Sequence, residues 1–155
     1  NNMNMKEFKT VDDILDFAID MEQKSIDFYK ELSNRAKSSE MKETFLRFVE
    51  EEIKHKAKLT KVKDEKIFTL GEEKVRELNI SEYVERTEPS PDMSYQDALI
   101  LAMKREKAAF RLYTKLASQT TNPELVNLLL SLAQEESKHK LMFEIEYDEV
   151  ILREN

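Results

Sequence analysis

The sequence contains no cysteine, which excludes disulfide bonds, zinc ribbons, thiol catalysis and a thiolate-bound iron centre within its 155 residues. No stretch approaches the roughly 20 apolar residues that a membrane span requires. Residues 1–9 are polar and lack the apolar segment of a signal peptide. We therefore expect a cytoplasmic protein with no membrane association, in which any bound metal is held by oxygen and nitrogen atoms.

Glycine occurs once and proline three times, whereas glutamate, lysine and leucine are abundant, and this composition is typical of long helices rather than strands. The length suits one domain, residues 1–155, with a single core. The net charge of −7 argues against a nucleic-acid partner, because such a surface repels phosphates. The composition therefore predicts an all-α domain.

An internal repeat aligns residues 10–59 with residues 94–143 without a gap, and the matched positions include Glu22 with Glu106 and His55 with His139. Each half reads as a helical hairpin, which predicts a four-helix bundle made of two hairpins. The N-cap candidates are Thr10, Ser38, Ser94 and Asn122. The helices are predicted near residues 11–36, 39–64, 95–119 and 123–151.

The segment at 65–94 has no counterpart in the first half, and we expect it to be a long crossover between the hairpins. Gly71 and the Glu-Pro-Ser-Pro run at 88–91 interrupt it. Its apolar residues predict a short helix or turn that packs on the bundle: Val75, Leu78, Ile80, Tyr83 and Val84.

Each apolar helical seam is interrupted at its middle by a glutamate, and in the second and fourth helices also by a histidine three residues later. Ionised carboxylates in a dry core oppose folding unless positive charge compensates them. Two divalent ions balance four carboxylates, and two neutral imidazoles complete the site. The predicted ligands are Glu22, Glu52, His55, Glu106, Glu136 and His139.

One glutamate from each of two helices plus a Glu-x-x-His pair from each of the other two is the ligand set of di-iron carboxylate bundles. Oxygen and nitrogen donors suit iron or manganese, and zinc also fits such a site. The alternative interpretation is a solvated run of charges that happens to contain histidine, but this does not explain why the charges fall on the apolar stripe.

Four sequence blocks carry a family resemblance: Ala-Ile-Asp-Met-Glu at 18–22, Phe-Tyr at 28–29, Glu-Glu-Ile-Lys-His at 51–55 and Glu-Glu-Ser-Lys-His at 135–139. They resemble the rubrerythrin branch of the ferritin-like superfamily. The resemblance implies a ferritin-like bundle in which the six residues bind two iron ions. It also implies reduction of hydrogen peroxide with electrons from a rubredoxin-type centre, which a cysteine-free, erythrin-type chain must obtain from a separate donor.

The sequence departs from this family at Ala109, where rubrerythrins carry an extra ligand glutamate. Whether the ligand exchange associated with that glutamate occurs here is left open. The six-ligand set is also similar to the ferroxidase centre of bacterioferritins. The long insertion at 65–93 and the short C-terminal tail argue against a storage shell, and we expect a homodimer.

Four further residues are candidates for supporting roles around the metals. Glu51 and Glu135 precede the ligand glutamates, where related proteins often have an acidic residue that orients a histidine on the opposite helix; the alternative is simple surface exposure. Tyr29 and Tyr113 lie on the ligand stripe, where they either donate hydrogen bonds to carboxylates or only pack in the core.

Several functions remain open at this point. The resemblance favours a peroxidase or a ferroxidase that acts on peroxide or dioxygen. A di-iron oxygenase acting on an organic substrate would need a cavity beside the metals, which the small residues Ser25 and Ala109 could leave. Iron storage without turnover and a purely structural bundle are the remaining alternatives.

Overall fold

The protein is an all-α four-helix bundle, as the composition and repeat predicted. The computed structural model describes residues 5–8, 10–65, 75–79, 85, 87–90 and 92–154. The helices are α1 (Val11–Asn34), α2 (Ser39–Asp64), α3 (Tyr95–Ser118) and α4 (Pro123–Glu154). Among the described residues, no helix is both long and apolar enough to cross a lipid bilayer.

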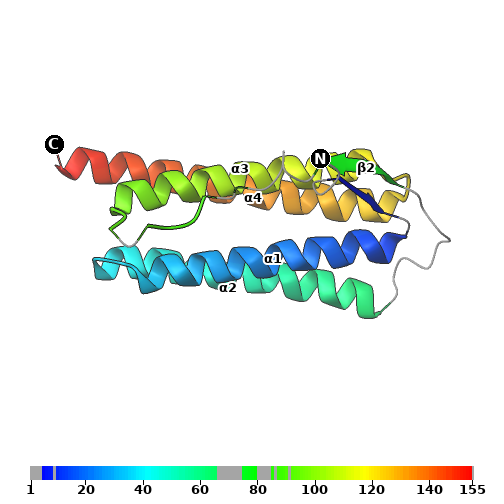
Figure 1. Cartoon of the computed structure of the whole chain (residues 1–155), viewed down its shortest axis with the longest axis horizontal. Coiled ribbons are helices and arrows are strands. Elements are labelled where there is room, and N and C mark those ends of the chain that lie inside the picture. The colour runs from blue at the N-terminus through cyan, green and yellow to red at the C-terminus, as the bar shows by residue number, and fades with distance from the viewer. Residues whose placement is uncertain are drawn as a thin grey trace.

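The helices form two antiparallel hairpins, α1 with α2 and α3 with α4, which lie side by side along the long axis of the molecule (Figure 1). Helix α2 ends at one end of the bundle and α3 begins at the opposite end, so these two helices run in the same direction (Figure 1). The connection between them therefore has to span the length of the bundle, which explains the long crossover.

Each helix begins at a polar side chain that accepts hydrogen bonds from the first backbone amides. Thr10 and Asp13 form a reciprocal capping box at the start of α1. The side chains of Ser38, Ser94 and Asn122 cap the other three helices. The four predicted N-caps are confirmed.

The prediction of a short helix or turn around Val75 and Leu78 was wrong, because Val75–Asn79 is a strand, β2, that pairs antiparallel with β1, Met5–Phe8. Five residues are too few for a stable helix but enough for a strand that has a partner. That partner lies near the start of the sequence, about 70 residues away. The remaining residues named for this segment, Gly71, Ile80, Tyr83, Val84 and Pro91, lie outside the described residues.

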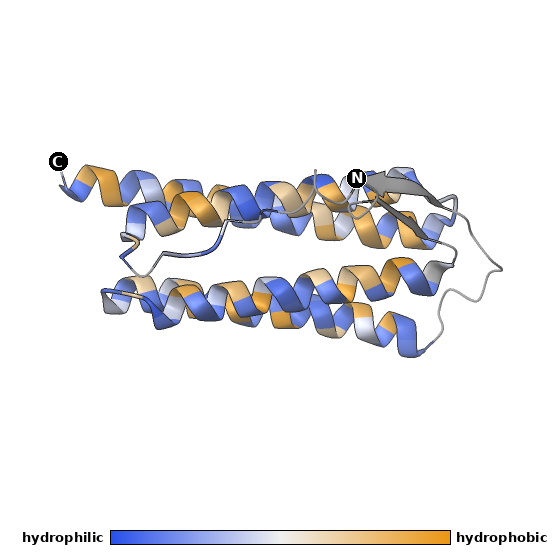
Figure 2. Ribbon diagram, viewed as in Figure 1, coloured by the Kyte–Doolittle hydropathy of each residue, from blue (hydrophilic) through white to orange (hydrophobic). Residues whose placement is uncertain are grey.

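Hydrophobic and hydrophilic positions alternate along every helix (Figure 2). Apolar side chains fill the interior of the bundle in two clusters. The first includes Leu15, Leu59, Leu116 and Leu129, and the second is rich in aromatic rings, with Phe45 stacked on Tyr29 at 6.1 Å between ring centroids. On every helix the two clusters are separated by the predicted ligand residues. The core is therefore divided by a single polar level near its middle.

Candidate metal centre

The structure brings all six predicted ligands together at the polar level of the core. None of them is more than 9% exposed, and Glu52 is completely buried. Glu22 comes from α1, Glu106 from α3, and the two Glu-x-x-His pairs from α2 and α4. The interior seam position that the sequence assigned to these residues is confirmed; their role as ligands stays a prediction.

The ligand atoms form two overlapping groups, in each of which all atoms lie within 4.8 Å of one another. One group contains Glu22 and His55, the other contains Glu106 and His139, and Glu52 and Glu136 belong to both. If two ions were bound, Glu52 and Glu136 would be the carboxylates available to both of them. The geometry therefore provides two sites with three oxygen donors and one nitrogen donor each.

The short contacts between ligands cross from one hairpin to the other. His55 Nδ1 lies 3.0 Å from Glu136 Oε1, and His139 Nδ1 lies 3.1 Å from Glu52 Oε1. The two imidazole rings are nearly parallel, with an interplanar angle of 7° and 5.5 Å between centroids. The sequence repeat is thus also an approximate symmetry of the site, with α2 and α4 exchanging equivalent partners.

Several buried ligand atoms have no hydrogen-bond partner within the part of the chain that the structure describes. They are Glu22 Oε2, both oxygens of Glu52, Glu106 Oε2 and His139 Nδ1, which is close to Glu52 without being aligned with it. An unsatisfied buried polar atom costs about 1–3 kcal/mol, and more when it is charged. A pair of divalent cations would satisfy these atoms together, so the residues fit the metal pair that the donor set implies.

A protein-family model described as Rubrerythrin matches residues 13–147. This range includes all six predicted ligands, which come from all four helices. The chain belongs to the rubrerythrin family. The resemblance inferred from the sequence blocks is therefore confirmed, and membership implies a ferritin-like protein that binds a di-iron centre. No curated protein and no solved structure matches the chain significantly.

The carboxylates of this rubrerythrin-family site differ in acidity. Burial raises the pKa of Glu22 and of Glu136 well above the ordinary range, and the charges of neighbouring carboxylates raise it further. Burial acts on Glu52 in the same direction, but close polar contacts with Glu22 and both histidines lower its pKa below the usual range. Glu52 therefore stays ionised when no metal is bound.

The histidines carry the compensating charge in the metal-free protein. Burial lowers the pKa of His55, but Glu22 and Glu52 outweigh it and raise the pKa to about 10. In the same way, Glu106 and Glu52 outweigh burial and raise the pKa of His139 to about 9. In the metal-free protein, the positive charge of the protonated imidazoles therefore balances the carboxylate charge that metal cations would balance when bound.

This charge state predicts that the metal-free protein loses stability in alkali. A histidine whose pKa is raised by folding stabilises the fold fully below about pH 6.5 and loses this contribution as the pH rises through 9–10. The raised pKa values of Glu22 and Glu136 act with the same sign. Since one pKa unit corresponds to about 1.4 kcal/mol, we expect Tm to fall by at least about 3 °C between pH 6.5 and 10.

The measurement is thermal unfolding of the metal-free protein across that range, with the zinc-saturated protein as the control. Coordination keeps the imidazoles deprotonated throughout, so the control should share only the background loss from surface groups. Equal slopes for the two forms would contradict the assignment of these protons.

Tyr29 and Tyr113 make the hydrogen bonds that their place on the ligand stripe suggested. Tyr29 donates to Glu106 Oε1 and Tyr113 donates to Glu22 Oε1, each at 2.5 Å. Burial, together with the adjacent carboxylate charge, raises the pKa of both phenols well above its ordinary value, so they remain donors. Both rings also pack in the core, so the two interpretations hold together. Each tyrosine fixes one of the outer carboxylates, Glu22 and Glu106, which belong to only one ligand group each.

The acidic residues that precede the bridging glutamates have different positions. A carboxylate oxygen of Glu135 and ring nitrogens of His55 and His139 lie within 4.8 Å of one another, which places Glu135 beside the histidine of the opposite helix. Glu51 belongs to no such group among the described residues, and its Oε2 lies 3.3 Å from Lys54 Nζ on the surface. Glu135 makes the equivalent surface pair, with its Oε1 3.5 Å from Lys138 Nζ, and differs from Glu51 in also lying near the two histidines.

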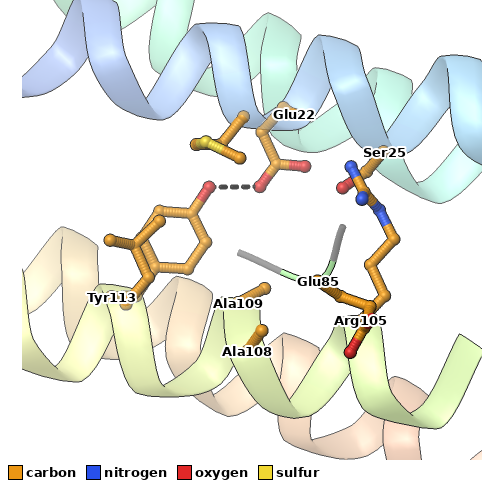
Figure 3. A pocket seen from close by; sticks show the side chains of 9 residues that line it. Glu22, Ser25, Glu85, Arg105, Ala108, Ala109 and Tyr113 are labelled. Atoms are coloured by element: carbon orange, nitrogen blue, oxygen red, sulfur yellow. Dashed lines mark hydrogen bonds between the residues drawn. The ribbon is translucent and has the colours of Figure 1, made fainter. Parts of the chain in front are cut away.

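A small pocket that the sequence only partly indicated lies beside Glu22, between α1 and α3 (Figure 3). Ser25 and Ala109 line it, as expected for a cavity at the ligand level, and so do Arg105 and Glu85. Its free volume of about 20 Å³ holds roughly one water molecule. Sequence reasoning missed Arg105, because its repeat counterpart is Met21 and no motif marks it.

Proposed function

We propose that this rubrerythrin-family chain is a di-iron oxidoreductase that reduces hydrogen peroxide. The observation that carries the proposal is the pair of ligand groups sharing Glu52 and Glu136, buried in the core and bordered by a water-sized pocket. Two ferrous ions in such a centre supply two electrons, which with two protons convert one hydrogen peroxide into two water molecules while both ions become ferric.

The protein's own residues support this chemistry by position and burial. Glu52 and Glu136 belong to both groups and so keep the two ions close together. Tyr29 and Tyr113 hold the outer carboxylates, Glu106 and Glu22, in one orientation. Because the centre is almost fully buried, bulk water is excluded and only small molecules reach it.

The size of the pocket favours a small oxidant over an organic substrate. A free volume of about 20 Å³ holds roughly one water molecule, a size far closer to that of peroxide than to the substrate of an oxygenase. The electron donor we propose is a rubredoxin-type iron centre outside these residues, since they contain no cysteine. A homodimer remains our expectation, whereas a large hollow oligomer in size-exclusion chromatography would indicate iron storage.

The test is stopped-flow oxidation of the anaerobic protein loaded with ferrous iron. We expect peroxide to oxidise the bound iron at least tenfold faster than free ferrous ion at the same concentration, and faster than dioxygen does. The control is Glu136→Gln, which weakens a ligand shared by both groups. A rate equal to that of free iron would refute the peroxidase, and a preference for dioxygen would favour a ferroxidase.

A further inference from the structure

The pocket beside Glu22 lies next to a larger groove on the outside of the bundle. Glu85 and Arg105 line both cavities and therefore stand between them. The groove lies between α1, at Lys24 and Asp27, and the crossover residues at 87–89. Together the two cavities mark the path that we infer from the surface to the predicted metal level.

The inner end of this path is an unsatisfied carboxylate. Glu22 Oε1 accepts the hydrogen bond from Tyr113, whereas Oε2 is buried without a hydrogen-bond partner among the described residues and lies 3.7 Å from His55 Nδ1. The side chain is only 2% exposed. Figure 3 shows Glu22 and Tyr113 at one side of the pocket, with Ala108 and Ala109 along its floor. Small side chains therefore leave the space next to one ligand group free.

The outer end of the path is an arginine with an unused donor. Arg105 extends from α3 toward α1 (Figure 3), and its Cζ atom lies 4.7 Å from the centroid of the Phe28 ring, which holds the guanidinium in place. Its Nε is buried and has no hydrogen-bond partner in the described part of the chain. A fixed cation with a free N–H thus borders the same pocket as the unpartnered Glu22 oxygen.

These two groups suit a small ligand that accepts a hydrogen bond or carries a negative charge. The Arg105 guanidinium supplies positive charge on the pocket lining, where the Glu85 carboxylate also stands. Hydrogen peroxide accepts a hydrogen bond through one oxygen and donates through the other. Hydrogen peroxide has two heavy atoms, and linear monoanions such as azide have three.

We propose that the pocket between Glu22 and Arg105 is the access and binding site for the oxidant, and that Arg105 is its positioning residue. The inference rests on the proposed function. It makes the two metal positions unequal, because a ligand in this pocket reaches the group that contains Glu22 and His55. The repeat does not reproduce the feature, since Met21 stands where symmetry would place a second arginine.

The test uses azide as the probe of the full chain loaded with ferric iron, and its readout is the absorbance of the azide complex. Arg105→Gln should raise the Kd for azide about tenfold or more, since a charge-assisted hydrogen bond is lost. Arg105→Lys should restore part of the affinity. Lys104→Gln is the matched control: it removes the same charge from an exposed neighbour outside the pocket and should change Kd less than twofold.

A second pair of variants fills the pocket instead of changing its charge. Ala109→Leu should abolish azide binding while the protein still holds two irons per chain. Ala109→Val serves if the larger side chain disturbs folding. In steady-state peroxide assays, Arg105→Gln should raise KM more than it lowers kcat. Unchanged azide affinity in both Arg105→Gln and a folded pocket-filling variant overturns the proposal.

The test also separates this proposal from the proposed function. If azide binding depends on Arg105 but peroxide does not oxidise the bound ferrous iron quickly, the proposal of an anion pocket stands and the proposed peroxidase function fails. If peroxide oxidises the iron rapidly and neither Arg105→Gln nor Ala109→Leu slows this oxidation, the peroxidase function stands and the proposed role of the pocket fails.

Discussion

Loading the metal-free protein with two divalent ions per chain is expected to raise its Tm by about 10 °C or more. The ions bind the folded state, in which the ligand atoms lie within 4.8 Å of one another, and not the unfolded chain. A ligand at a thousand times its Kd adds about 4 kcal/mol per site. For a domain of this length each kcal/mol corresponds to about 2–4 °C. Zinc avoids redox chemistry, and calorimetry gives the midpoint and the stoichiometry.

The matched control for this experiment comes from the approximate symmetry of the site. His139 belongs to one of the two complete ligand groups and His55 to the other. His139→Gln should therefore leave one intact group, lower the stoichiometry from two ions to one, and remove about half of the stabilisation. His55→Gln should do the same. If no divalent ion stabilises the protein, the metal centre is refuted and a purely structural bundle is the remaining interpretation.

The fold and the polar level of the core could be predicted because both follow from sequence patterns within single helices. Thr10, Ser38, Ser94 and Asn122 each stop a helix from extending backwards, whatever lies around them. A glutamate in an apolar seam is equally local, since its burial follows from the helical period alone. The repeat then shows that the four interruptions occur at equivalent positions. The polar level between the two apolar clusters follows from this register.

Contacts between segments far apart in sequence could not be predicted in this way. Tyr29 lies on the same stripe as Glu22, yet its hydroxyl donates to Glu106 on α3, and Tyr113 donates to Glu22 on α1. The partners cross because α1 and α3 run in opposite directions at the metal level (Figure 1). The pairing of β1 with β2 and the position of Arg105 over Phe28 also depend on packing. No periodicity in the sequence encodes any of them.

Replacing the two shared carboxylates one at a time by glutamine is expected to change the stability of the metal-free protein in opposite directions. Glutamine resembles a protonated glutamate. The pKa of Glu136 is raised by burial, so above the ordinary glutamate pKa the folded state must keep a proton that the unfolded chain releases, and Glu136→Gln removes this cost and should stabilise the fold by about 1–3 kcal/mol. This gain should grow as the pH rises from the ordinary pKa of about 4.5 toward the raised pKa, and should be nearly absent at pH 5.

Glu52→Gln should instead destabilise the metal-free fold by about 3–5 kcal/mol at neutral pH. Glu52 is fully buried and ionised, and its oxygens lie 3.8 Å from His55 Nδ1 and 3.1 Å from His139 Nδ1. Without it, two protonated imidazoles remain in the core with less opposing charge. Urea unfolding of both variants at pH 5 and pH 8 gives the comparison, and both should lose most of the stabilisation by zinc. Shifts of the same sign at pH 8 would show that the two carboxylates are equivalent, and the asymmetry inferred for the metal-free centre would then be wrong.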